Sequence, residues 1–141
     1  MALRDVELDI ALVLEAAGLG LSMADVEPTL YAGPIPEAAP DRLVAVRGLS
    51  GGEPEDYLGN VTAIYRPEVQ VIIRGNRNGY RDTLALASAC FELLRNIRPS
   101  GYIRIDVESS QPEYMGADDL DRHRFIFTVN TEYRATNSIS I

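Results

Sequence analysis

His123 and Cys90 are the only histidine and the only cysteine, so they limit the metal and nucleophile chemistry open to the chain. A zinc site takes several histidine, cysteine or carboxylate ligands, and a catalytic thiol needs a partner base. His123 stands between Arg122 and Arg124, which favour the neutral imidazole, and we interpret it as an ordinary residue of the surface or of the start of a strand. Cys90 falls near the apolar face of an expected helix, where a thiol packs as a small hydrophobic side chain. We predict no catalytic residue and no metal site.

The densest carboxylate cluster contains Glu113, Asp118, Asp119 and Asp121. The segment lacks the alternating oxygen ligands and the terminal glutamate of a calcium-binding loop. We therefore interpret these acids as a polar turn.

Glycines near residues 18–20 and 48–52 are not followed by the lysine of a phosphate-binding loop. Residues 74–79 (RGNRNG) carry two arginines just before an expected helix, where backbone N–H groups could hold an anion. Glycine and asparagine are also the residues that turn a strand into a helix, and we favour that interpretation. No nucleotide or other cofactor is predicted.

Charge and length narrow the class of protein. The chain has 13 basic and 21 acidic side chains, a net charge of −8, and its arginines are dispersed, which argues against tight DNA binding. Its 141 residues suit one domain, residues 1–141, with a hydrophobic core. No apolar run approaches the roughly 20 residues that cross a bilayer. No export signal precedes the first apolar stretch, so we expect production in the cytoplasm.

Two amphipathic helices are expected to position these groups. Apolar residues recur at spacings of three and four from Leu3 to Ala17, and glycines then stop the helix. A second helix opens near Tyr80, with Asn76 or Asn78 as its cap, and ends before Pro99. Its apolar stripe consists of Tyr80, Leu84, Ala87, Phe91 and Leu94.

Compact runs rich in β-branched residues and ended by glycines predict strands at 42–47 and 69–74, and alternating apolar and polar residues predict strands at 103–107 and 125–133. The proline-rich segment 29–41 is expected to be an extended connector or an edge segment of the sheet, with brief pairing at 30–31, and residues 61–65 could extend the second strand. The acidic, glycine-rich segment from Gly48 to Asn60 is expected to protrude as a loop. The order α-β-β-α-β-β predicts an α+β fold, a small mostly antiparallel sheet with both helices packed on it.

Residues 67–75 (PEVQVIIRG), leading into the helix near Tyr80, resemble a strand of the bacteriophage minor capsid and tail-terminator family, roughly P-x-V-Q-[IV]-x-[IV]-R-G. Residues 111–130 are similar to that family's hairpin, P-x-x-[IL]-G-x-D-x-x-G-R-x-x-[FY]-x-x-N. Two departures are visible, Tyr114-Met115 before Gly116 and Asp121 where a turn glycine is usual, so we expect the local turn to differ. The resemblance spans about Pro67 to Arg134.

The resemblance implies a non-enzymatic virion protein at the head-to-tail joint, assembled in the host cytoplasm. Members of the family form hexameric rings that cap the tail tube, stop its growth and meet head-completion proteins. The implied partners are therefore further copies of the chain, the tail-tube protein and a head-completion protein. DNA would pass through without sequence-specific binding, and neither a cofactor nor a metal is implied.

A ring needs a heterologous interface, in which different patches of two subunits meet. We expect acids of the 48–60 loop to face arginines of the neighbouring subunit, in a contact that salt weakens. The candidate interface residues are Glu53, Glu55 and Asp56 against Arg77 or Arg81, with the polar edges at Arg74 and Asp119.

Two other functions stay open. A head-completion or connector protein has a similar size and also assembles around the DNA channel. A small-molecule-binding or enzymatic α+β domain is the alternative from another class, because a fold does not fix function.

Overall fold

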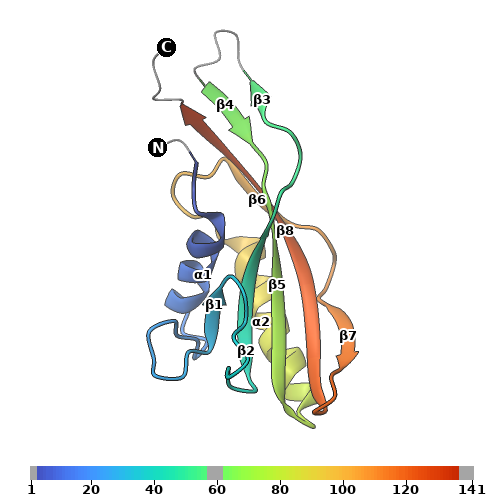
Figure 1. The fold of residues 1–141 in the computed structure, drawn as a ribbon. Coiled ribbons are helices and arrows are strands. Elements are labelled where there is room, and N and C mark those ends of the chain that lie inside the picture. The colour runs from blue at the N-terminus through green and yellow to red at the C-terminus, as the bar shows by residue number, and fades with distance from the viewer. Residues whose placement is uncertain (1–2, 57–61, 137–141) are drawn as a thin grey trace.

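The structure is a computed structural model, and it describes residues 3–56 and 62–136. Two helices and eight strands occupy these residues (Figure 1). In chain order they are α1 (Val6–Ala16), β1 (Leu30–Ala32), β2 (Leu43–Leu49), β3 (Glu55–Asp56), β4 (Thr62–Tyr65), β5 (Glu68–Arg77), α2 (Tyr80–Asn96), β6 (Arg104–Val107), β7 (Glu113–Ala117) and β8 (Arg122–Thr136).

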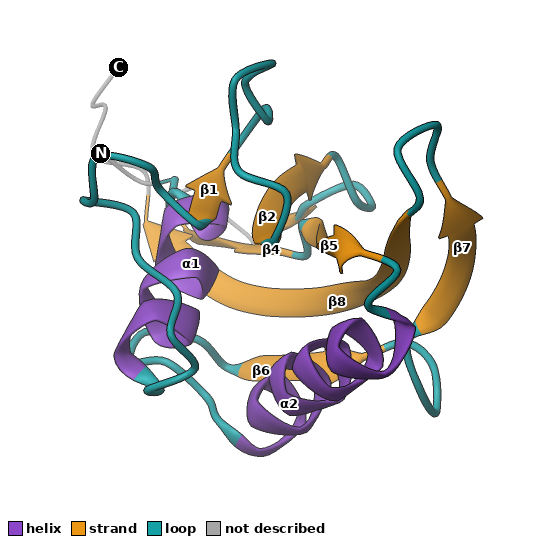
Figure 2. Cartoon of the chain, turned by 90° about the horizontal axis from the view of Figure 1, so that it is seen from below, coloured by secondary structure: helices purple, strands orange, loops and turns teal. Residues whose placement is uncertain are grey.

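The sheet is organised around β8. On one side β8 pairs with β5 and then β4, and on the other side with β7 and β6, always antiparallel. β2 lies next to β5, and β1 joins β2 as a parallel neighbour at the edge. Both helices pack on one face of this curved sheet (Figure 2). The predicted α+β fold, with a mostly antiparallel sheet, is confirmed.

The core lies between the helices and the inward face of β2, β5 and β8. Val71 and Phe127 are opposite one another on β5 and β8 and are both buried. The Phe91 ring of α2 meets Phe127 edge to face, with centroids 5.4 Å apart. The alternation of apolar and polar residues therefore predicted the correct inner face of β8. Leu84, predicted for the same stripe as Phe91, is only partly buried.

Helix α1 begins three residues later than predicted. The Asp5 carboxylate accepts a hydrogen bond from the amide of Leu8 (3.2 Å), which caps the helix at Val6. Leu3 therefore lies outside the helix and is exposed. The helix ends at Ala16, and Gly18 follows with a left-handed backbone (φ 75°), as the sequence predicted for its end.

The predicted asparagine cap of α2 is wrong. Gly79 is the N-cap, and no side chain caps the helix, because β5 continues to Arg77 and Asn78 forms the turn. The hydroxyl of Thr83 instead donates to the Gly79 carbonyl (2.6 Å). A β-carbon on Gly75 would lie 1.6 Å from Thr83 Oγ1, so only glycine lets β5 and α2 approach this closely.

The segment 48–60 is more regular than the predicted loop. Gly48 and Leu49 extend β2, and Glu55–Asp56 forms β3 against β4, while residues 57–61 lie outside the described residues. Had the β2–β5 register continued, Glu55 would face Thr62, but it faces Ile64. The two extra residues are accommodated near Gly51, whose backbone is left-handed (φ 70°).

β3, β4 and residues 131–136 of β8 project beyond the rest of the chain, and we call them the arm (Figure 1). The described end of the segment, Glu55–Asp56, thus protrudes as predicted, but as a strand. The register between β8 and β4–β5 is continuous across Arg66-Pro67, since Tyr65 faces Tyr133 and Glu68 faces Asn130. At the joint, the amide and the hydroxyl of Thr131 both donate to the Pro67 carbonyl, at 3.1 and 2.7 Å.

The strand expected at 103–107 begins at Arg104, and Ile103 before it is exposed. β8 is longer than the predicted 125–133 because its ends pair with β7 and β4. Neither helix in residues 3–56 and 62–136 is long and apolar enough to cross a membrane.

Candidate functional site

The cysteine and the histidine are both held in packed surroundings. Cys90 is fully buried, and burial raises the pKa of its thiol to about 12, which keeps it protonated and unreactive at neutral pH. His123, at the start of β8, lies 2.7 Å by its Nδ1 from the Tyr114 hydroxyl, and its ring meets Tyr80 edge to face. Among the described residues no group of histidine, cysteine and carboxylate side chains is arranged to hold a metal ion.

The acidic segment before β8 is a hydrogen-bonded turn. Asp118 accepts bonds from the amides of Leu120 (3.0 Å) and Arg122 (3.1 Å) and from the Arg122 guanidinium (2.8 Å). Burial alone would raise the pKa of Asp118, but these hydrogen bonds outweigh it and lower the pKa below its ordinary value. The carboxylate is thus committed to shaping the turn.

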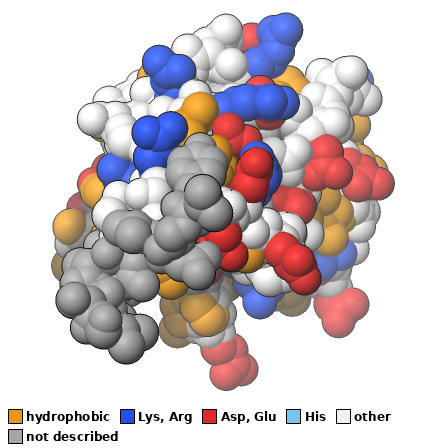
Figure 3. All heavy atoms as spheres, turned by 90° about the horizontal axis from the view of Figure 1, so that it is seen from above, with side chains coloured by type: hydrophobic (Ala, Val, Ile, Leu, Met, Phe, Trp, Pro, Cys, Tyr) orange, Lys and Arg blue, Asp and Glu red, His pale blue; other side chains and the backbone are white. Residues whose placement is uncertain are grey.

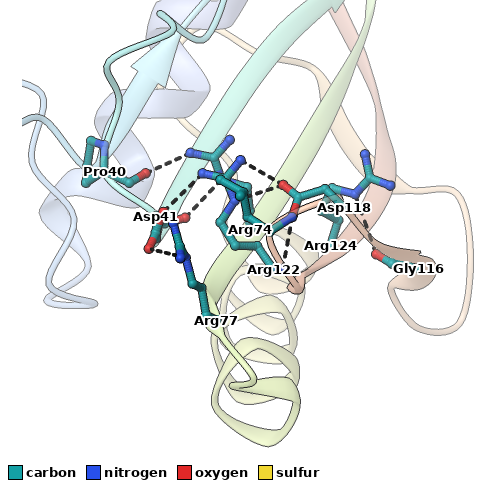
Figure 4. Close-up of polar contacts among 9 residues, drawn as sticks. Pro40, Asp41, Arg74, Arg77, Gly116, Asp118, Arg122 and Arg124 are labelled. Carbon is teal, nitrogen blue, oxygen red and sulfur yellow. Dashed lines mark hydrogen bonds and ion pairs between the residues drawn. The ribbon is translucent and has the colours of Figure 1, made fainter.

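Four arginines gather at the end of β5 and β8 that lies away from the arm, and we call them the arginine cluster: Arg74, Arg77, Arg122 and Arg124 (Figure 4). Arg74 is opposite Arg124, and Arg77 is opposite Arg122. Like charges directly across a strand pair are unfavourable, so the cluster depends on neighbouring acceptors.

Those acceptors come largely from the connector before β2. Arg74 donates to the carbonyls of Pro40 (2.8 Å) and Asp41 (3.0 Å), and the Asp41 carboxylate lies 3.1 Å from Arg122 and 3.8 Å from Arg77. The pKa of Arg74 is lowered, mainly because the side chain is partly buried and also because the positive charge of Arg122 is nearby. The network fastens the proline-rich connector to the sheet, so Arg74 and Arg122 have a structural role.

The remaining candidates at this end are exposed. The Arg81 guanidinium, in the first turn of α2, lies 5.4 Å from the centroid of the Tyr80 ring. Asp119 is exposed on the turn before β8. Arg77 is also exposed, so Arg77, Arg81 and Asp119 are accessible to a partner, unlike Arg122.

The acids of the arm are divided between internal and outward positions. Glu55 lies 2.7 Å from Arg66, whose Nε also lies 3.0 Å from Glu132, and these contacts raise the pKa of Arg66, Glu55 contributing most. Glu53 and Asp56 are exposed. Seen from the arm end, acidic and basic side chains share the surface (Figure 3).

The structure does not bring the two groups of candidate interface residues together within one chain. The arm joins β5 at Glu68, and Arg77 is the last residue of β5, so a strand of ten residues, roughly 30 Å, separates them. A contact between Glu53 or Asp56 and Arg77 or Arg81 can therefore form only between subunits, and it stays a prediction.

Sequence reasoning missed two apolar surfaces. Leu8 and Leu12 lie on the outer face of α1 and are exposed, although the stripe at spacings of three and four indicated only the inner face. An open groove of about 350 Å³ lies between the end of α2 and the start of β6, with Ile97 and Ile103 exposed in it. In the sequence, Leu8 and Leu12 outside the inner stripe were the signal that could have predicted the first surface. The groove could not be predicted in this way, because it forms only when the chain folds and brings the end of α2 next to the start of β6.

A further hollow of about 380 Å³ lies where the arm meets the start of α1. Apolar side chains that line it include Leu3, Val6, Leu49, Tyr65 and Tyr133. Across this region the Glu7 carboxylate accepts a hydrogen bond from the Gly48 amide (2.6 Å), which fixes α1 to β2. The described arrangement offers packing surfaces and ion pairs, with no juxtaposed nucleophile and base.

Comparison with known proteins gave two findings. A family model described as "Bacteriophage tail terminator protein" matches residues 13–137. A chain in a solved structure, "Virion of native gene transfer agent (GTA) particle", has a similar fold, with a TM-score of 0.59 and 16% identity. That likeness covers 92% of this chain and 94% of the other. The comparison with curated proteins gave no match.

Proposed function

Because the chain belongs to the bacteriophage tail terminator family, a family of virion proteins with a structural role in completing the tail, we propose that it forms a ring that caps the tail tube. The match over residues 13–137 carries this proposal, since it includes the end of α1, all of α2 and all the strands. It confirms the family resemblance seen over residues 67–134 and extends it toward the N-terminus. The formation of a ring, its six subunits and the identity of its partners are all part of what we propose.

A non-catalytic role is part of the proposal. The described residues supply a buried thiol, a histidine packed among aromatic rings and carboxylates committed to turns and ion pairs. In the proposed ring, these groups stabilise the subunit while its surface meets the tail-tube protein on one side and a head-completion protein on the other. DNA passes through the ring without being read.

We propose that charged residues orient neighbouring subunits. Glu53 and Asp56 of one subunit are exposed, whereas Glu55 already pairs with Arg66, so the first two are the better candidates to meet Arg77 or Arg81 of the neighbouring subunit. Such exposed pairs contribute at most about 1 kcal/mol each. Because the two groups lie at opposite ends of a subunit, this contact requires neighbours that are offset along its long axis.

The proposed orientation can be tested by reversing charges. Arg77→Glu with Arg81→Glu should raise the concentration needed for ring formation, and adding Glu53→Arg with Asp56→Arg should lower it again. Mass photometry over a range of protein and salt concentrations measures both. Equal assembly of all variants would remove these residues from the interface and leave the ring itself untouched.

A phage lacking the gene tests the function directly. We expect filled heads and separate tails, with tails of uncontrolled length, because nothing would end polymerisation of the tube. Electron microscopy of the lysate distinguishes this result from tails of normal length beside heads that leak DNA, which a head-completion protein would give. Normal infectious particles would overturn the proposal.

A further inference from the structure

Helix α1 is apolar on two sides. Its inner side, with Ile10 and Leu14, is fully buried, whereas Leu8 and Leu12 on the outer side are 39% and 47% exposed. In the single chain the outer side lies open, so it has the composition of a surface that another molecule covers.

The outer leucines have an acidic rim. Asp5, Glu7, Asp9 and Glu15 are the charged residues of the helix and its cap, and no basic residue lies within the helix. Hydrogen bonds hold these acids in place, for example that from the Met23 amide to Glu15 (2.8 Å). Of these acids only Asp9 is paired with a basic residue among the described salt bridges, with Arg4 at 3.5 Å, so the apolar patch has a border that is negative overall.

The groove after α2 has the opposite border. Ile97 and Ile103 are each 40% exposed within it, and Arg95, Arg98 and Arg104 line its sides. The Arg98 guanidinium donates to the Ile103 carbonyl (3.1 Å), which holds the two walls together. Only Arg104 is paired with a neighbouring acid among the described salt bridges, so the border is positive.

We infer that the Leu8–Leu12 face of α1 on one subunit docks in the Ile97–Ile103 groove of the next. The inference rests on the proposed ring and names its apolar contact. Apolar centre meets apolar centre, and an acidic rim meets an arginine rim, so the occupant that fits each surface is a second copy of this chain. Because the two surfaces differ, the contact is heterologous and repeats around a ring.

The two surfaces have a fixed relative orientation in each subunit. The Tyr102 hydroxyl, in the loop between the groove's isoleucines, donates to the Asp9 carboxylate of α1 (2.7 Å). The Arg4 guanidinium lies over the Tyr102 ring, 5.1 Å from its centroid. A fixed angle between the surface that docks and the surface that receives lets equal subunits close into a ring of defined size.

Single substitutions and a mixing experiment test the inference with the full-length protein. Leu12→Glu places a charge on the apolar face of α1, and Ile97→Glu places a charge in the apolar groove. Val26→Glu is the matched control, because Val26 is fully exposed in the loop after α1 and belongs neither to the helix nor to the lining of the groove. Circular-dichroism melts establish that all three variants fold.

Each interface variant should need at least about tenfold more protein to assemble, the effect expected for a charge at the centre of an interface, whereas the control assembles normally. A mixture of the two interface variants should give dimers and no rings. In that mixture only the intact helix face of Ile97→Glu and the intact groove of Leu12→Glu can meet.

Three results would overturn the inference. Rings from both variants would show that neither surface is needed, with the proposed function still standing. Loss of assembly in Leu12→Glu alone, with no dimers in the mixture, would indicate that α1 pairs with α1. Normal rings from Leu12→Glu that no longer join tails would assign the helix face to another virion protein. Wild-type protein that never forms rings on tail tubes would instead overturn the proposed function.

Discussion

The backbone amide of Asn78 donates a hydrogen bond to the carbonyl of Asp121 (3.0 Å), and these are the two non-glycine residues with positive φ in the described part of the chain. Asn78 ends the turn from β5 toward α2, and Asp121 ends the turn from β7 into β8. The bond therefore joins two left-handed turns beside the arginine cluster. Asp121, with φ 58°, has the left-handed backbone conformation that glycine adopts without strain.

Asp121→Val should destabilise the protein by about 1–2 kcal/mol, because a β-branched residue is strained in the left-handed region. Asp121→Gly should leave the stability within about 1 kcal/mol of the parent or raise it. Chemical denaturation measures both values. Asp119→Val, two residues earlier and without positive φ, is the control and should change little. Equal losses for the two valine variants would contradict the assigned strain.

The contribution of Asp118 to stability should depend on pH. Its folded-state pKa is lowered, so its stabilising effect is present above the unfolded pKa, near 4, and is lost as the pH falls through the folded value. Asp118→Asn should therefore lower the melting temperature at pH 7 and have a smaller effect at pH 3. Asp119→Asn serves as the exposed control. A melting difference that stays constant between pH 7 and pH 3 would count against the carboxylate's role.

Leu94 and Leu84 provide a matched pair on α2. Leu94 is fully buried and Leu84 only partly, so Leu94→Ala should cost about 2–5 kcal/mol and Leu84→Ala clearly less. Urea unfolding of both variants gives the comparison. Similar losses for the two leucines would mean that α2 is rotated from the described position.

Phe127→Asp should prevent folding because it places a charge in the core, while Asp56→Ala should leave the stability unchanged.

Gly51 should be essential for the geometry of the arm. A β-carbon there would lie 2.2 Å from the carbonyl oxygen of Arg66, in a backbone that is already left-handed. Gly51→Ala should therefore loosen the pairing of β3 with β4, seen as faster amide hydrogen exchange in residues 62–65. Gly52→Ala is the neighbouring control, since a β-carbon there meets nothing within 4 Å. Equal exchange in the two variants would show that the close approach is unimportant.

The elements that could be predicted from the sequence are those in which the spacing of apolar residues follows the buried face. The inner face of β8 was predictable, because Phe125, Phe127, Val129 and Tyr133 recur at even spacing and are all buried, and in β5 the buried residues Val69, Val71 and Ile73 also fall at every second position. β7 gives no such signal, because its side chains are largely exposed and it is held by backbone bonds to β8. β3 has two acidic residues and exists only through its pairing with β4.

The candidate surfaces were predictable to a lesser degree. Glu53 and Asp56 were identified as exposed from the composition of their segment, but the internal pairing of Glu55 needed the arm. The structural role of Arg74 depends on carbonyls more than thirty residues away in the chain, which no local pattern predicts. That the chain forms one domain, and that the named interface residues meet a neighbour, remain predictions.

The length of β8 has a mechanical consequence. Its ladder with β4 and β5 runs from Thr136 opposite Thr62 to Arg124 opposite Arg74 without a change of register. A load on the arm therefore passes along one backbone to the turn at Asp121, and no hinge absorbs it within that ladder. In the proposed assembly, pressure on the arm would tilt the subunit as a rigid lever, and would move the opposite end by an amount set by the length of the strand.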